Sequence, residues 1–492
     1  MMEKRREAGV LLPISALPSA YGIGCFSEEA YRFVDFLADA GQRVWQILPL
    51  CPTSFGDSPY QSPCSFGGNP YFISLDALCG EGLLLSEDLP PKTWSDRVDY
   101  KELYETRYPV LRKAYGRFRE REKPWDYGIF LAESCFWLED YALFMAIKEK
   151  HSASLSDLPE ALRKREPSAL SDARRELWAE IDFFRFLQYE FFKQWRSLHC
   201  YAASKNIKIL GDMPIYVSAD SSDLWADPNL FELDGEGRPV YVAGCPPDGF
   251  SLRGQLWGNP VYAWQEHKKE DFRWWRARIR QALSMYDLVR IDHFRGFDAY
   301  YSIPYGAADA TDGYWRSAPG EELFSSLSDM SGTDRIIAED LGFMTEGVRR
   351  LLSKCGFSGM KILQFGFDGD EDHMPYSYPE NSVVYTGTHD NPTLCGWLDR
   401  LGGDERVRME KYLCDVSRDT ETVAAHLISI AMQSPSRLCV IPMQDYLFLG
   451  DEGRMNIPSS PSGNWSWRMR GEDMRGEISA RIKEFTHIGG RL

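Results

Sequence analysis

A basic surplus is missing from this chain of 492 residues, in which 56 Lys and Arg stand against 73 Asp and Glu, a formal net charge of −17. Without excess positive charge the protein has little with which to neutralise phosphates, so the composition argues against nucleic acid or an anionic membrane as its partner. The chain also lacks any run of the roughly 20 apolar residues that span a bilayer. We therefore expect no nucleic acid and no membrane among its partners.

Paired cysteines are missing as well. The eleven cysteines are an odd number, and no two of them stand in a Cys-x-x-Cys pattern. This spacing predicts neither a zinc site nor a disulfide framework, and reduced thiols are typical of cytosolic proteins. Pro13 interrupts the first apolar run after a few residues, which is not typical of a secretory signal. The sequence predicts a cytoplasmic protein with no metal site, and it indicates no oligomeric state.

Apolar segments are plentiful, since 43% of the residues are hydrophobic and can bury a sizeable core. Eight short apolar runs end in polar or turn residues, as strands do, and helical patterns separate many of them. These runs span residues 9–14, 43–48, 207–212, 287–292, 335–340, 361–366, 382–388 and 437–442. Strands that alternate with helices favour an α/β fold, a parallel (β/α)₈ TIM barrel. An open doubly wound sheet is the alternative, although no Gly-rich dinucleotide loop follows the first strand.

The predicted strands are unevenly spaced along the chain. A barrel needs only about 250 residues, so we predict that residues 1–492 form a single barrel that carries insertions. Residues 85–200 contain two long amphipathic segments, 126–150 and 179–205, and predict a helical subdomain between the second and third strands. Residues 214–262 are rich in Gly, Pro, Asp and Trp with little periodicity. They predict a long loop between the third and fourth strands that covers the substrate.

Three of the predicted strand ends carry a carboxylate: Asp292 in "VRIDH", Glu339 in "IIAEDLG" and Asp390 in "YTGTHDN". The carboxyl ends of barrel strands meet at the rim that holds the active site, so we expect these carboxylates to lie together. Strand alternation places Arg290 on the same face as Asp292, where its charge would keep the carboxyl ionised. Alternation leaves open whether Glu339 or Asp340 faces the barrel axis.

Neighbouring carboxylates of this kind suit glycoside chemistry. One ionised carboxylate attacks the anomeric carbon, while a second carboxyl group, kept protonated, donates to the leaving oxygen. A structural ion pair at a strand end is the alternative interpretation of Arg290 and Asp292. His293 and His389 could donate hydrogen bonds to sugar hydroxyls, although a single histidine is more often a hydrogen-bonded packing residue.

Nine sequence strings, in order over nearly the whole chain, resemble one family: the amylomaltases or disproportionating enzymes, which are 4-α-glucanotransferases related to the α-amylase clan. The strings are "YGIG" (21–24), "GQRVWQILPL" (41–50), "GDSPYQSPCSFGGNPYFI" (56–73), "GDMPIYVSADSSDLWA" (211–226), "PPDGFSLRGQLWGNPVYAW" (246–264), "RIDHFRGF" (290–297), "IIAEDLG" (336–342), "YTGTHDN" (385–391) and "NWSWR" (464–468). The resemblance implies a barrel with insertions and without the C-terminal β-sandwich of α-amylases. It implies no metal and no organic cofactor.

The resemblance also implies roles for individual residues. Asp292 matches the nucleophile, Glu339 the general acid/base, and Asp390 the carboxylate that holds the hydroxyls of the cleaved sugar. The residues that match substrate-contacting positions are Arg290, His293, His389, Tyr60, Asp212, Asp248 and Trp257. The chain departs from the family at Gly249, where an aromatic residue is common, and at Arg253, where a small polar residue is usual. It also has "PSS" at 458–460 in place of "PGT", and all three departures bear on acceptor use.

The activity implied is transfer of an α-1,4-glucan segment from a malto-oligosaccharide or a starch-like glucan to the 4-hydroxyl of another glucan or glucose. Retention through a covalent glycosyl-enzyme would require about 5–5.5 Å between the carboxyl groups of nucleophile and acid. A cleft covered by aromatic rings would favour sugar over water as acceptor. The candidate cover residues are Phe250, Trp257, Tyr262 and Trp264. Two alternatives are a retaining α-1,4-glucan hydrolase with the same carboxylates and, less favoured, a non-catalytic glycan-binding barrel.

Overall fold

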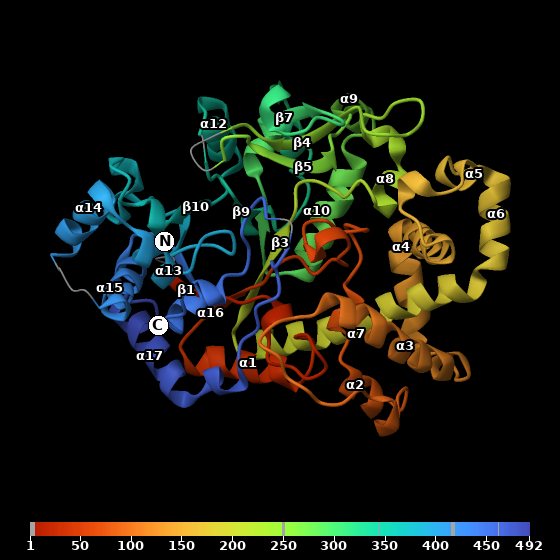
Figure 1. The fold of residues 1–492 in the computed structure, drawn as a ribbon, viewed down its shortest axis with the longest axis horizontal. Helices are drawn as coiled ribbons and strands as arrows, with labels where there is room; N and C mark the ends of the chain where they lie inside the picture. Colours follow the sequence, from red (N-terminus) through yellow and green to blue (C-terminus); the bar gives the residue numbers. More distant parts are fainter. Residues whose placement is uncertain (1–4, 248–250, 343, 415–418, 461) are drawn as a thin grey trace.

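Eight parallel strands form the centre of the protein, a computed structural model that describes residues 5–247, 251–342, 344–414, 419–460 and 462–492 (Figure 1). The strands are β1 (Glu7–Leu11), β2 (Val44–Gln46), β3 (Lys208–Met213), β6 (Leu288–Ile291), β9 (Ile336–Ala338), β10 (Gly359–Ile362), β11 (Ser382–Tyr385) and β12 (Leu438–Pro442). Their order in the sheet is β10-β11-β12-β1-β2-β3-β6-β9. A parallel bridge between Ile337 and Ser358 brings β9 beside β10. The (β/α)₈ barrel is thereby confirmed and the open sheet is wrong. Every strand overlaps its predicted segment, although β1 and β10 each begin two residues earlier than predicted and share only part of it.

The strands are mostly buried on both faces and therefore rich in apolar residues, with a few polar side chains such as Asp212 on β3 and Arg290 on β6. Inward side chains two residues apart, such as Leu438 and Val440 of β12, join Leu11, Val44 and Ile337 from other strands in one cluster that fills the barrel. A larger cluster lies between the strands and the outer helices. On α1 (Glu28–Asp39), for example, the buried residues follow the helical spacing i, i+3, i+4 and i+7; they are Ala30, Phe33, Val34 and Leu37.

Long helices fill the segment between β2 and β3, and Figure 1 shows them gathered on one side of the barrel. They are α3 (Tyr100–Arg119), α4 (Trp125–His151), α5 (Glu160–Arg163), α6 (Pro167–Glu176) and α7 (Trp178–Ser204). The ends of α4 and α7 fall within one residue of the segments predicted at 126–150 and 179–205. Aromatic side chains of α7, among them Phe186 and Tyr189, pack against Phe118 of α3, and Tyr189 also packs against Tyr127 of α4.

The remaining helices surround the barrel and connect its strands. They are α2 (Leu75–Gly80), α8 (Ser222–Ala226), α9 (Trp264–Lys269), α10 (Arg273–Met285), α11 (Gly320–Ser325), α12 (Glu346–Cys355), α13 (Leu394–Arg400), α14 (Gly403–Leu413), α15 (Thr420–Gln433), α16 (Met443–Tyr446) and α17 (Gly476–Ile488). Across the residues that the structure describes, no helix has both the length and the apolarity to cross a membrane.

A second, antiparallel sheet lies at one end of the barrel, at the top of Figure 1. Its order is β5-β4-β7-β8, formed by β4 (Tyr241–Cys245), β5 (Gln255–Pro260), β7 (Ala299–Pro304) and β8 (Tyr314–Ser317). The sequence analysis did not predict this sheet, and the segment 214–262, predicted as a long loop, contains α8, β4 and β5. The strands are short, β8 is largely exposed and β5 is mostly of intermediate exposure, so their alternation is weak, and β4 pairs with the distant β7.

Candidate active site

Arg290 of β6 lies at the centre of three carboxylates. Its Nη1 donates to Asp212 Oδ2 at 2.6 Å, and its Nη2 donates to Glu339 Oε2 at 2.6 Å and to Asp292 Oδ1 at 3.1 Å. These partners come from β3, β6 and the loop after β9, which are neighbours in the barrel. The Arg290 side chain is only 2% exposed, so its charge acts on the carboxylates with little screening by water.

The turn after β6 wraps around Glu339. His293 adopts a left-handed backbone (φ 45°), and its N–H donates to Glu339 Oε2 at 2.8 Å. Asp340 points elsewhere, because its Oδ1 accepts the N–H of Met360 on β10 at 2.6 Å. The structure thus resolves what alternation left open: Glu339 faces Arg290 and Asp292, while Asp340 anchors the strand that closes the barrel.

The two central carboxyl groups are joined by a side-chain hydrogen bond and divide one proton unequally. Burial and the charge of Glu339 raise the pKa of Asp292 well above its usual range, although Arg290 opposes this. Burial also opposes ionisation of Glu339, but Arg290 and the N–H of His293 outweigh it and lower the pKa of Glu339 to about 2. The two groups therefore titrate as one coupled pair, in which the surroundings favour the ionised form of Glu339 and the protonated form of Asp292.

Arg290 favours ionised Asp292, as expected, but burial and the charge of Glu339 oppose that effect on the pKa of Asp292. Arg290 does contact Asp292, but its shorter hydrogen bonds go to Asp212 and Glu339, which neighbouring strands bring beside it. Strand alternation describes only one chain segment and cannot reveal these partners. Asp292 Oδ1 and Glu339 Oε2 both accept from Arg290 Nη2, at 3.1 and 2.6 Å, so these two oxygens lie closer together than the roughly 6.5–9.5 Å gap that admits water in inverting enzymes.

Asp390, the third carboxylate, lies in the loop after β11 and is 43% exposed at its side chain. Asn456 Nδ2 donates to Asp390 Oδ1 at 2.6 Å, and Arg454 Nη2 donates to the Asp390 carbonyl at 2.9 Å. His389 Nε2 lies 3.3 Å from Asp390 Oδ2. Sequence reasoning missed Asn456 and Arg454, because they lie 66 and 64 residues further along the chain with no motif that links them to Asp390.

Tyr60 connects the two sides of the site. Its hydroxyl donates to Asp212 Oδ2 at 2.7 Å and lies 3.0 Å from His389 Nε2, and its ring stacks on the His389 ring at 5.4 Å. Burial raises the pKa of Tyr60 well above its usual range, so the phenol stays a donor. The side chain of Asp212 is 0% exposed. The buried carboxylate of Asp212 therefore accepts hydrogen bonds from Arg290 and Tyr60. Contact of a sugar with Asp212 or Arg290 stays a prediction.

His293 and Trp257 lie against each other beside Glu339, with ring centroids 4.9 Å apart and the planes at 88°. Burial lowers the pKa of His293 to about 4, against the effect of the Glu339 charge, so the ring is neutral at pH 7. His293 Nε2 is buried and has no hydrogen-bond partner among the described residues. Asp248, predicted to contact sugar, lies outside the described residues.

Among the aromatic residues predicted to cover the cleft, only Trp257 lies against the site within the described part of the chain. Tyr262 and Trp264 are 1% and 8% exposed and pack with Trp275 in the core. Phe250 and Gly249 lie outside the described residues. Tyr262 and Trp264 therefore pack in the core and do not cover the cleft.

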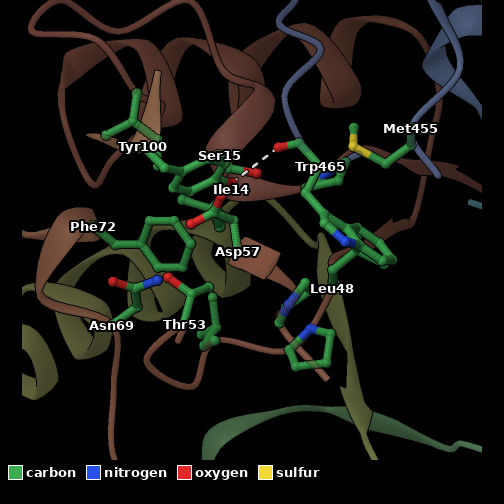
Figure 2. A pocket seen from close by; sticks show the side chains of 15 residues that line it. Ile14, Ser15, Leu48, Thr53, Asp57, Asn69, Phe72, Tyr100, Met455 and Trp465 are labelled. Carbon is green, nitrogen blue, oxygen red and sulfur yellow. Dashed lines mark hydrogen bonds between the residues drawn. The ribbon is translucent and has the colours of Figure 1, made fainter. Parts of the chain in front are cut away.

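A small pocket adjoins the site, and Figure 2 shows Asp57, Tyr100 and Trp465 around it. The Tyr100 hydroxyl donates to the Trp465 carbonyl at 2.9 Å. The Trp465 ring lies 5.7 Å from Tyr60 and 5.8 Å from His389, so one wall of the pocket is also a wall of the site. No group of three or more His, Cys, Asp and Glu side chains in the described ranges is arranged to hold a metal ion.

Comparison with known proteins gives one consistent result. A family model described as 4-alpha-glucanotransferase matches residues 12–474. The 4-alpha-glucanotransferase of Thermus thermophilus is 45% identical over 502 residues, 100% of both chains. The chloroplastic/amyloplastic 4-alpha-glucanotransferase of Solanum tuberosum is 41% identical over 495 residues, 98% of this chain and 86% of that one.

Solved structures agree in fold with this chain. An amylomaltase from Streptococcus agalactiae in complex with acarbose has a TM-score of 0.95 and 43% identity, and the match covers 99% of this chain and 100% of that one. An amylomaltase from Corynebacterium glutamicum, 19% identical, has a TM-score of 0.77 over 98% of this chain and 75% of that chain. At that identity the second likeness shows the fold alone.

Proposed function

The chain belongs to the 4-α-glucanotransferase family, and from this premise we propose which glucans it acts on and how. It transfers an α-1,4-glucan segment from a malto-oligosaccharide or starch-like donor to the 4-hydroxyl of another glucan or of glucose. The observation that carries this proposal is the direct contact of Asp292 and Glu339 at neighbouring strand ends, with Asp390 on the same rim.

Donor binding prepares the two carboxyl groups for the first displacement. A nucleophile must be ionised and an acid protonated, yet burial and the charge of Glu339 favour the protonated form of Asp292 in the unliganded protein. Transfer of that proton to Glu339 along their hydrogen bond gives both required states without an outside proton. Protonated Glu339 then loses its ionic attraction to Arg290, and the guanidinium is left to stabilise ionised Asp292.

The two displacements then follow with balanced bonds and protons. Asp292 attacks the anomeric carbon while Glu339 gives its proton to the leaving glucan oxygen, which forms a covalent glycosyl-enzyme. Ionised Glu339 next takes the proton of the acceptor 4-hydroxyl as that oxygen attacks the anomeric carbon and releases Asp292. Each displacement inverts the anomeric centre, so the new linkage is α.

Sugar hydroxyls are recognised by the groups that the barrel leaves accessible. The half-exposed carboxylate of Asp390 accepts from sugar hydroxyls, and Trp257 supplies an apolar wall. His293 Nε2, which is buried and has no partner among the described residues, is the further group that we assign to a sugar hydroxyl. The insertion that carries Trp257, residues 214–262, therefore borders the substrate. Residues 85–200 form the helical insertion between β2 and β3. Support for both assignments comes from the position of α3 to α7 and of Trp257.

Incubation of the purified protein with maltotriose tests the proposal. Glucose together with oligosaccharides longer than three units indicates transfer, and the total of reducing ends should stay nearly constant because each cleavage is matched by a new bond. The Asp292→Ala variant is the control for contaminating activity. A steady rise in reducing ends without longer products would instead identify a retaining hydrolase, and no products at all would identify a glycan-binding barrel.

A further inference from the structure

A bulge in β5 aims Trp257 at the site. Val242 of β4 pairs with Pro260 and Gly244 pairs with Leu256, so Ala243 alone lies opposite the three residues 257–259. Gly258 within this bulge has a left-handed backbone (φ 79°), which glycine adopts without strain. Bulges turn side chains and interrupt the hydrogen-bond ladder, so their backbone groups need partners from elsewhere.

Gln61 supplies that partner. Its Nε2 donates to the carbonyl of Trp257 at 3.1 Å and to Asn259 Oδ1 at 3.0 Å. Asn259 returns the contact from Nδ2 to Gln61 Oε1 at 3.3 Å, and the same Nδ2 donates to the Val217 carbonyl at 2.7 Å. Because Asn259 is only 4% exposed, water competes little for these bonds. Gln61 and Asn259 thus form an amide clasp over the bulge.

The clasp joins two walls of the active site. Gln61 directly follows Tyr60, whose hydroxyl contacts Asp212 and His389. The bulge carries Trp257, whose ring lies against His293 beside Glu339. The two segments are about 200 residues apart in sequence, since Gln61 and Asn259 are separated by 198 positions. The clasp therefore sets the separation of Tyr60 and Trp257 more directly than either backbone does.

We propose that Gln61 is a positioning residue that holds the Trp257 wall closed over the glycosyl-enzyme and thereby decides how often a sugar rather than water completes the reaction. The proposal rests on the proposed function, because the partition between sugar and water exists only if a covalent intermediate forms. Gln61 touches the bulge and not the catalytic carboxyl groups, so it acts through Trp257. A looser wall admits water to the intermediate.

The first test replaces Gln61 by alanine and measures reducing ends released per molecule of maltotriose consumed. The hydrolysed share should rise by about tenfold, the equivalent of about 1.4 kcal/mol or roughly one net hydrogen bond. Gln265→Ala, at an exposed glutamine of α9, is the matched control and should behave as wild type. Thermal unfolding of each variant shows whether the fold is intact. An unchanged hydrolysed share in folded Gln61→Ala overturns the proposal.

Gln61→Glu gives the second, independent measurement. The new carboxyl group faces two acceptors, the Trp257 carbonyl and Asn259 Oδ1, so its ionised form is repelled and its pKa lies above the usual value of about 4.3. Protonation restores a donor. At pH 8 Gln61→Glu should therefore cleave maltotriose more slowly than Gln61→Ala, and it should recover towards wild type as the pH falls to about 5.

Each rate is divided by the wild-type rate at the same pH, which removes the titration of the catalytic pair. The clasp is supported if the relative cleavage rate of Gln61→Glu rises as the pH falls while that of Gln61→Ala does not change with pH. Relative rates of the two variants that change with pH in parallel overturn it. This readout is donor cleavage and needs no sugar acceptor. If wild type only hydrolyses maltotriose, the proposed function fails, while the pH comparison still decides whether Gln61 positions the wall.

Discussion

The two sides of the active site hold their carboxylates in different ways. Asp292 and Glu339 lie beside neighbouring strands, share a buried arginine and contact each other directly. Asp390 lies on a loop, is half-exposed, and is held by hydrogen bonds from Asn456 and Arg454. On the side of the site that Asp292 and Glu339 form, the strand side, burial and charge control the protonation of the carboxyl groups. On the side that Asp390 forms, the loop side, hydrogen bonds control where the carboxylate points. We therefore expect chemistry from the first side and substrate orientation from the second.

The largest expected effect is on the strand side, at Asp292. Replacement by alanine removes the nucleophile, so kcat should fall by a factor on the order of 10⁴ or more. Transfer from maltotriose, followed by chromatography of the products, measures the loss, and calorimetric titration with a malto-oligosaccharide should show that binding survives. Activity close to that of wild type would remove Asp292 from the mechanism and with it the chemical role of the strand side.

Glu339→Gln comes next and separates acid catalysis from structure. Transfer from maltotriose should fall by about 10³, because the leaving glucan oxygen needs a proton. A donor with a good leaving group, such as a maltosyl fluoride, should still glycosylate Asp292, which mass spectrometry of the trapped protein would detect.

Asp340→Asn is the control for Glu339→Gln. It retains the neighbouring acid but weakens the hydrogen bond to Met360 on β10, so it should lower the free energy of unfolding by about 1–2 kcal/mol with a much smaller effect on transfer. A greater loss of transfer in Asp340→Asn than in Glu339→Gln would reverse the assignment of the acid.

The loop side should respond more weakly. Asn456→Ala removes the 2.6 Å hydrogen bond to Asp390 Oδ1 and should lower kcat/KM for maltotriose by about tenfold, the equivalent of one hydrogen bond to a charged group. Most of the change should appear in KM, because the chemistry on the strand side is untouched. A fall in kcat as large as that of Glu339→Gln would show that the two sides do not divide the work in this way.

The smallest effect concerns stability and pH. The pKa of Asp292 is raised in the folded protein, so its contribution to stability is present when the group is protonated and is lost as pH rises through that raised pKa. Asp292→Asn cannot ionise and should lose this dependence. The free energy of unfolding, measured by thermal denaturation, should then be higher for the variant than for wild type by about 1 kcal/mol or more at alkaline pH. Near pH 4 the variant should have no such advantage. Equal pH dependence in both proteins would place the proton elsewhere.

The pattern of apolar residues along the chain was sufficient to predict the barrel. The eight strands were recognisable because they are buried on both faces for most of their length, which gives short apolar runs such as those of β11 and β12. The second sheet escaped prediction for the opposite reason: β8 is mostly exposed and β5 is bulged, so neither shows a clean alternation. The grouping of Asp292, Glu339 and Asp390 followed from the rule that barrel strands end on one rim.

The sequence by itself determined the barrel, the family and the residues whose chemistry suits glucan transfer, because these depend on apolar periodicity and on short motifs within one segment. Tertiary structure alone decided that Glu339 and not Asp340 faces the site, that Arg290 lies closer to Glu339 than to Asp292, and that Asn456 and Gln61 hold distant groups in place. Those facts depend on which atoms from separate segments come within hydrogen-bond reach, and protonation follows from the burial and charges that such neighbours create.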